Sequence, residues 1–224
     1  TITDEDRKLI RDKYNSIIYE PEKDYSWVYK IIASLSILII IVVINNRKLN
    51  KEIKKRKLAE EELSKIAHID GLTNAFSRRK IESILELELN REKRYNRGLS
   101  LIFFDVDNFK LINDQLGHST GDNVLEKISS LVNNTMRKTD SFGRWGGEEF
   151  IIILPETNKV QAKNIAYLLK EKIANFDFEI DRKVTCSFGV SQFEETDCAD
   201  SLLTRADNAM YYVKRNGKDE VKVV

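Results

Sequence analysis

Two groups of acidic residues stand where apolar, strand-like runs end. Asp105 and Asp107 close the run LSLIFFDVD, and Glu148 and Glu149 lie between a Gly-Gly pair and the run FIIIL. Folding can bring these groups together, and clustered carboxylates repel unless a cation offsets their charge. A hard divalent ion such as Mg²⁺ prefers one or two carboxylates combined with substrate phosphates. The alternative interpretation is that these acids are ordinary solvated charges at strand ends.

Residues that can bind a nucleotide lie around these acids. Lys110 closely follows the first acidic pair, and Lys214 and Lys218, four residues apart on a predicted helix, share one face. These lysines can bind phosphate, although most exposed lysines simply face water. Asn113 and Asp122 can read a guanine edge, because a carboxylate accepts from two adjacent N–H groups that adenine lacks. We expect a turn between Gly117 and Gly121 to deliver Asp122 to the start of the next helix, where it can also be only a helix cap.

Helices and strands must alternate after about residue 70 to position these groups. Helical periodicity occurs around residues 79–94, 124–132, 160–176 and 201–215, and strand-like runs occupy 99–107, 184–193 and 222–224. Residues 141–154, SFGRWGGEEFIIIL, predict a β-hairpin that turns at Gly146-Gly147. The pattern predicts an α/β (α+β) domain, in which helices cover a sheet.

A transmembrane helix is predicted at residues 27–46. The run WVYKIIASLSILIIIVVI carries one charge, Lys30, and with its flanks it reaches the ~20 residues that a bilayer requires. The unbroken apolar surface from Ile31 to Ile44 argues against a core helix with one apolar stripe. Residues 45–58 carry seven basic residues and one acid, whereas residues 1–26 carry seven acids and five bases. The positive-inside rule therefore places residues 1–26 outside and residues 47–224 in the cytoplasm.

Residues 47–68 predict a helical linker between this membrane segment and the domain at residues 69–224. The linker is rich in Lys, Glu and Leu and contains no Gly or Pro. Leu49, Ile53, Leu63 and Ala67 share an a/d-like stripe, which fits either a solvated stalk or a short parallel coiled coil. Because the chain begins at Thr1 and not at Met, we expect it to be the C-terminal part of a longer sensor receptor.

Composition excludes several classes of protein. The 224 residues include 37 Lys+Arg and 36 Asp+Glu, a net charge of +1, so a generally basic nucleic-acid-binding protein is excluded. Two cysteines exclude a disulfide-dense scaffold and a tetrathiolate zinc site, and two histidines leave little for a histidine-rich metal centre.

Four ordered blocks between residue 70 and the C-terminus resemble one known family. They are DGLT at 70–73, FFDVDNFKLINDQLGHSTGD at 103–122, GGEEF at 146–150 and ADNAMYYVKRNGKD at 206–219. Together they resemble the GGDEF family of diguanylate cyclases, of which GGEEF is a variant signature. The resemblance implies a mainly antiparallel sheet similar to the palm of nucleotide polymerases and class III nucleotide cyclases.

The resemblance also implies roles for individual residues. Asp105, the Val106 carbonyl and Glu148 would hold Mg²⁺ or Mn²⁺, and Glu149 would bind a second metal or help remove the 3′-hydroxyl proton. The implied substrate-binding set is Asn113, Asp122, Phe109, Lys110, Gly146, Gly147, Lys214 and Lys218.

A control site is implied as well. Arg137 and Asp140 match the RxxD pattern at which this family binds its product, although a simple helix-end charge pair fits the same residues. Leu168 stands where many members have another arginine, so product inhibition stays open. Arg91 or Arg94 of a neighbouring protomer is expected to contribute.

The family's reaction joins two GTP molecules into cyclic di-GMP and releases two pyrophosphates. Each domain would hold one GTP, so a homodimer would be required. We therefore expect a diguanylate cyclase at the cytoplasmic (inner) membrane, single-pass in this chain, which serves as the output of a signal receptor. The alternatives are a catalytically silent module that binds GTP or cyclic di-GMP, and a purely structural membrane stalk with a dimerising cap.

Overall fold

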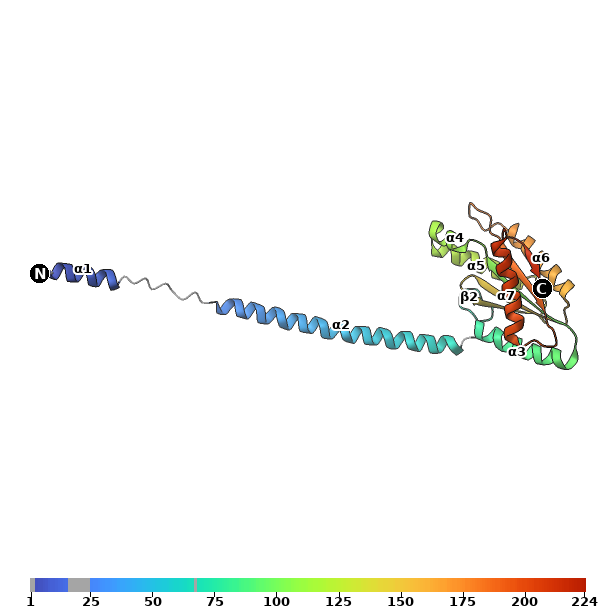
Figure 1. Cartoon of the computed structure of the whole chain (residues 1–224), viewed down its shortest axis with the longest axis horizontal. Helices are drawn as coiled ribbons and strands as arrows, with labels where there is room; N and C mark the ends of the chain where they lie inside the picture. The colour runs from blue at the N-terminus through green and yellow to red at the C-terminus, as the bar shows by residue number, and fades with distance from the viewer. Residues whose placement is uncertain (1–2, 16–24, 67) are drawn as a thin grey trace. The chain divides into compact units, whose positions relative to one another are not determined.

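The computed structural model describes residues 3–15, 25–66 and 68–224. Contacts divide the chain into two compact units, Thr1–Glu61 and Glu62–Val224. Helix α1 (Asp4–Asn15) and most of helix α2 (Ser26–Ile66) belong to the first unit (Figure 1). Part of the predicted outer segment, residues 16–24, lies outside the described residues, as does Ala67 of the predicted a/d stripe.

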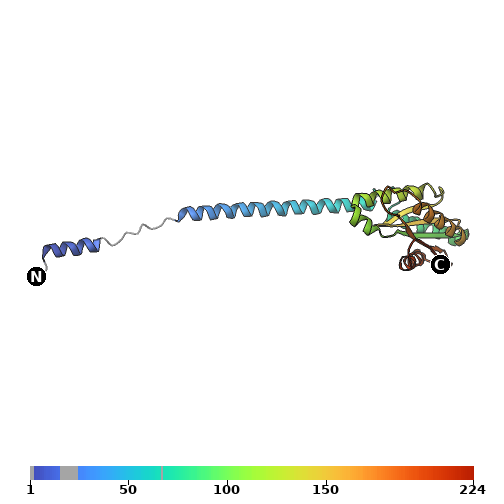
Figure 2. The ribbon, with the colours of Figure 1, turned by 90° about the horizontal axis from the view of Figure 1, so that it is seen from above.

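Helix α2 runs without interruption through the predicted membrane segment and through the linker as far as Ile66 (Figure 2). Its portion Ser26–Lys55 is long and apolar enough to cross a membrane, with a mean hydropathy of 2.5 over its best window. Length and composition are the two properties that make it a candidate membrane span. Leu49 and Ile53 of the predicted stripe are both exposed on this helix.

A five-stranded sheet forms the centre of the second unit. The strands are β1 (Leu99–Val106), β2 (Ser141–Gly146), β3 (Glu149–Pro155), β4 (Cys186–Gln192) and β5 (Val221–Val223), in the order β2-β3-β1-β4-β5. All neighbours are antiparallel except β4 and β5, which are parallel. The prediction of a mainly antiparallel sheet flanked by helices is confirmed, and the predicted hairpin is the β2–β3 pair.

Helices cover both faces of this sheet. They are α3 (Arg78–Tyr95), α4 (Phe109–Leu116), α5 (His118–Asn133), α6 (Lys159–Ala174) and α7 (Ala199–Arg215). Because side chains alternate along a strand, Ile102 and Phe104 of β1 pack toward α5 and α6, whereas Leu101 and Phe103 pack toward α3 and α7. Asp105 continues the second series, at the end of β1.

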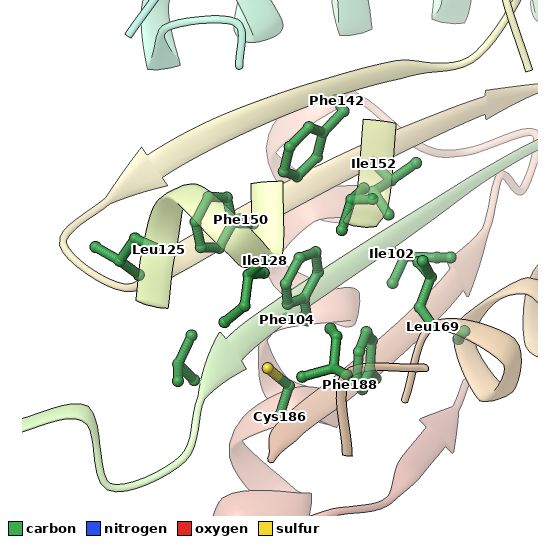
Figure 3. Packing of buried hydrophobic residues seen from close by; sticks show 14 of the residues in the cluster. Ile102, Phe104, Leu125, Ile128, Phe142, Phe150, Ile152, Leu169, Cys186 and Phe188 are labelled. Atoms are coloured by element: carbon green, nitrogen blue, oxygen red, sulfur yellow. The ribbon is translucent and has the colours of Figure 1, made fainter. Parts of the chain in front are cut away.

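A row of phenylalanines fixes the register of the central strands (Figure 3). The Phe104 ring stacks on Phe150 of β3 and Phe188 of β4, with centroids 5.2 and 5.0 Å apart. Stacked aromatic pairs at this spacing add to the stability gained from their burial. A shift of one residue would turn these rings to the wrong face, so the core also fixes which residue pairs with Asp105.

Helix α7 lies directly on the backbone of β4 at Gly189. A Cβ at this position would come within 1.9 Å of the Ala206 carbonyl oxygen, so only glycine permits the contact. The close packing positions α7 along the sheet and carries Lys214, near the end of the helix, to the end of β1.

Candidate active site

The pairing of β1 with β3 brings the two predicted acidic groups together. Asp105 lies opposite Glu149 in the ladder, and the Val106 N–H donates to the Glu148 carbonyl oxygen at 3.3 Å. Directly opposed residues of an antiparallel pair project their side chains from the same face. Asp105 is buried at 2% exposure, whereas Glu148 and Glu149 are half-buried at the hairpin.

The ionisable side chains at this strand end shift one another's pKa values. Burial raises the pKa of Asp105 to about 7, against the opposing effect of Lys214 and with added repulsion from Glu148 and Glu149. Burial also raises the pKa of Glu149, and the next cause is the negative charge of Asp207 on α7. The repulsion of Glu148 and Glu149 on Asp105 therefore favours binding of a cation at this strand end.

The Lys214 ammonium provides positive charge in this structure. Its Nζ forms an ion pair with Asp105 Oδ1 at 2.7 Å, and in the part of the chain that the structure describes no other donor contacts this buried oxygen. A divalent cation, which binds oxygen ligands, can replace the lysine ammonium as the positive charge beside this buried carboxylate. Among the described residues, no group of three or more His, Cys, Asp or Glu side chains is arranged to hold a metal ion. The metal-binding set that the family resemblance implies is of another kind, because it combines two carboxylates with the Val106 backbone carbonyl.

The predicted phosphate-binding lysines come from three elements near this strand end. Lys110 is exposed in the first turn of α4, and Lys214 lies in the last turn of α7. Lys218 follows α7 in a turn, and its Nζ donates to Asn108 Oδ1 at 2.5 Å. The contact ties Lys218 to the loop between β1 and α4, where the acidic strand ends.

The predicted guanine-binding pair lies where α4 meets α5. A Cβ at Gly121 would lie 1.9 Å from Asn113 Oδ1 and 3.1 Å from the Phe109 ring, so Asn113 packs against the helix turn that carries Asp122. Asn113 Oδ1 is buried without a donor, and Asp122 is exposed. Phe109, predicted to bind substrate, is a buried member of the core.

The sequence interpretation of Gly121 was wrong in one respect. We expected Gly117 and Gly121 to bracket a turn before the helix, but α5 already begins at His118. Gly121 is therefore buried inside α5, where it makes room for Asn113.

The hairpin tip is open and is fixed by an arginine that sequence reasoning missed. Gly146 and Gly147 are exposed with nothing within 4 Å of a Cβ position, and Gly147 has a φ of +53° that favours glycine. Arg144 Nε donates to the Gly147 carbonyl at 2.9 Å, and its Nη1 donates to Asp70 Oδ1 at 3.1 Å. Arg144 thus connects the hairpin tip to the DGLT turn. The sequence signal that could have identified Arg144 is its position two residues before Gly146.

The residues of the predicted control site lie elsewhere. Asp140 Oδ2 accepts from the Arg137 backbone N–H at 2.9 Å, so the two residues form a local turn. Arg137 lines a cavity of about 780 Å³ together with Arg91 and Arg97. Arg91 of the same chain lines this cavity, and the expected contribution of Arg91 or Arg94 from a neighbouring protomer stays a prediction. Of the described residues, Leu168 is not part of the lining.

Comparison with known proteins places the chain in a family. Residues 67–220 match the family described as "Diguanylate cyclase, GGDEF domain". The chain belongs to this family. The diguanylate cyclase DgcM of Escherichia coli strain K12 is 35% identical over 170 residues, which are 76% of this chain and 42% of DgcM. The match therefore spans less than half the length of DgcM.

Solved structures show the same GGDEF fold. The active GGEEF domain of a diguanylate cyclase from Vibrio cholerae is 36% identical, with a TM-score of 0.63 over 66% of this chain and 96% of that one. The GGDEF domain of DgcB from Caulobacter crescentus, solved in complex with c-di-GMP, is 26% identical, with a TM-score of 0.67. That likeness covers 70% of this chain and 92% of the DgcB chain.

Proposed function

We propose that this chain is a diguanylate cyclase, which condenses two GTP molecules into cyclic di-GMP and releases two pyrophosphates. The observation that carries the proposal is the convergence of Asp105, Glu148 and Glu149 at one strand end, beside Lys214. The family assignment and the relatives named diguanylate cyclases support the same reaction.

The residues of the site divide into metal ligands, phosphate-binding lysines and Glu149. Asp105, the Val106 carbonyl and Glu148 would hold Mg²⁺ or Mn²⁺, which when bound neutralises charge on the triphosphate. Lys110, Lys214 and Lys218 bind phosphate oxygens and fix the α-phosphorus for in-line attack by a 3′-hydroxyl. Glu149 either accepts the proton of that hydroxyl or binds a second metal.

Base selection is assigned to Asn113 and Asp122. The Asp122 carboxylate accepts from the N1–H and 2-amino group of guanine, and the Asn113 amide can both donate and accept. Adenine would leave the carboxylate unpaired, which costs binding free energy. The buried, unpartnered Asn113 Oδ1 supports this assignment.

The active enzyme is proposed to be a membrane-anchored homodimer. Each site holds one GTP, so two domains must face each other for two phosphodiester bonds to form. Ser26–Lys55 would span the inner membrane once and place residues 69–224 in the cytoplasm, as the positive flank at residues 45–58 favours. The linker at residues 47–68 would join the protomers and transmit a signal from the outer side.

The cavity at Arg137 is proposed to bind the product. Its three arginines, Arg91, Arg97 and Arg137, can grip phosphate in two-pronged hydrogen bonds and stack on guanine once Arg91 and Arg97 release their ion pairs with Glu88 and Glu156. Asp140 would hold the Arg137 backbone in its turn. We propose feedback inhibition through this cavity.

Turnover of GTP tests the proposed function. The full chain in lipid nanodiscs, given GTP and Mg²⁺, should yield cyclic di-GMP by mass spectrometry. Glu148→Ala should abolish product while circular dichroism stays unchanged, and Glu126→Ala, an exposed site on α5, should leave turnover intact. GTP binding without product in the unmodified chain would instead support the silent binding module.

A further inference from the structure

Asp107 differs from Asp105 in how its carboxylate is used. It is buried at 4% exposure, and protein donors occupy both of its oxygens. Oδ1 accepts from the Ser187 hydroxyl at 2.7 Å, and Oδ2 accepts from the Thr185 hydroxyl at 2.8 Å and the Asp219 N–H at 3.1 Å. Three donors satisfy the charge without a cation. Asp107 therefore joins the end of β1 to β4 and to the turn after α7.

This turn is one that side chains rarely adopt. Gly217, Lys218 and Asp219 have φ values of +115°, +63° and +47° in succession. Left-handed backbone costs a non-glycine residue about 1 kcal/mol or more, so the surroundings must hold Lys218 and Asp219 in place. Of the described hydrogen bonds, the one from the Asp219 N–H to Asp107 anchors the turn directly to the strand end.

The side chain of Lys218 is fixed from the same loop. Its Nζ donates to Asn108 Oδ1 at 2.5 Å, and Asn108 directly follows Asp107. Two consecutive residues thus contact both parts of the lysine turn, Asp107 through the backbone and Asn108 through the ammonium, while the Lys218 N–H donates to the Val213 carbonyl oxygen of α7 at 3.0 Å. The arrangement places a cation beside the strand end that carries the active-site acids.

We propose that Asp107 is a positioning residue for Lys218. It holds the turn at residues 217–219 so that the Lys218 ammonium meets a GTP phosphate, and it does not ligate the metal. The inference rests on the proposed function only for the identity of the ligand, a guanosine triphosphate. The test below distinguishes this role of Asp107 from two others, a ligand of the metal and a residue that serves stability alone.

The test is a double-mutant cycle read by binding. Affinity for a non-hydrolysable GTP analogue with Mg²⁺ is measured by calorimetry on the full chain in nanodiscs. Asp107→Ala and Lys218→Ala should each weaken binding about tenfold, the loss of one charge-assisted contact. The double variant should bind no worse than Lys218→Ala alone, because Asp107 acts through Lys218. Independent, multiplying losses would overturn the inference.

The conservative variant separates positioning from metal ligation. Asp107→Asn keeps an oxygen for the Asp219 N–H, so its affinity should stay within about threefold of the unmodified chain. A metal ligand would lose its charge in Asn as in Ala, so equal losses would refute positioning. Hydrogen exchange of residues 217–219 should accelerate in Asp107→Ala and stay slow in Asp107→Asn.

A matched control covers general destabilisation. Ser187 and Ser191 are both fully buried on β4, but Ser191 donates to the Leu202 carbonyl, remote from Asp107. Ser187→Ala should speed exchange at residues 217–219 and weaken binding, whereas Ser191→Ala should do neither. Equal effects would reduce Asp107 to a stability role. Because binding and exchange need no turnover, a chain that binds GTP but makes no product would refute the proposed function and leave this inference standing.

Discussion

Gly121→Ala should impair GTP use with little effect on the fold. An Ala Cβ would lie 1.9 Å from Asn113 Oδ1, so one of the two must move. The atom in the way is the end of a flexible side chain, and Asn113 can rotate its amide away. The helix itself gains, because Ala is favoured over Gly inside a helix by roughly 0.5–1 kcal/mol. We therefore expect a free energy of unfolding within about 1 kcal/mol of the unmodified chain.

The cost should appear in substrate binding. An Asn113 amide that has turned away gives up its hydrogen bond to the base, which is worth about 1–2 kcal/mol, or about a five- to thirtyfold rise in KM for GTP. Steady-state release of pyrophosphate measures KM, and urea unfolding measures stability. Gly71→Ala is the matched control, because nothing lies within 4 Å of its Cβ position.

A second variant makes the reasoning refutable. If Gly121 acts only by leaving room for Asn113, Asn113→Ala should have a similar KM, and the double variant should be no worse than Asn113→Ala. A Gly121→Ala chain with unchanged KM and raised stability would show that Asn113 does not contact the base. A large loss of stability would show that α4 and α5 cannot adjust.

Three further predictions follow from the same contacts. Arg144→Ala should lower kcat about tenfold by freeing the hairpin tip at Gly147, whereas a KM effect alone in the pyrophosphate assay would contradict this role. Partial burial would raise the pKa of Asp70, but hydrogen bonds from Thr73 and Arg144 outweigh it and lower this pKa in the folded chain. The contribution of Asp70 to the free energy of unfolding is therefore present above pH 3.8, the ordinary pKa, and is lost as pH falls through the lower folded pKa. In urea unfolding, the advantage of the unmodified chain over Asp70→Asn should shrink only in that range, and a constant advantage down to pH 2.5 would refute it. Arg137→Ala should relieve inhibition by added cyclic di-GMP, and unchanged inhibition would place the product elsewhere.

The sequence predicted the elements of this site better than their contacts. The run ending in Asp105 and the Gly-Gly hairpin are local patterns, so strand, turn and acidic positions could be read directly. The run KVV at the C-terminus could likewise be read as an edge strand, and β5 confirms it. The place of Gly121 could not be predicted, because its φ is ordinary and only the approach of Asn113 from another helix requires glycine there.

Arg144 and Asp107 show the same limit in a different form. Arg144 joins Asp70 to the hairpin tip across 74 positions of sequence, and Asp107 meets the Asp219 N–H across 112. The hydrophobic periodicity of the sequence cannot predict these contacts, because each contact forms only when the sheet has assembled. The roles of charged residues next to a signature motif therefore have to be assigned from the three-dimensional structure.

The two aspartates that end β1 illustrate why spacing alone cannot assign ligands. Asp105 and Asp107 are both buried and lie two residues apart, and the sequence offers both as candidates for a cation. The buried Asp105 Oδ1 contacts the Lys214 ammonium and, among the described residues, no other donor, so a divalent cation has only this ion pair to replace. Asp107 has three donors, two hydroxyls and a backbone N–H, spread over both oxygens, which leaves little of its acceptor capacity for a metal. The number of donors around each carboxylate, and not its place in the motif, separates the proposed ligand from the residue that holds the fold around it.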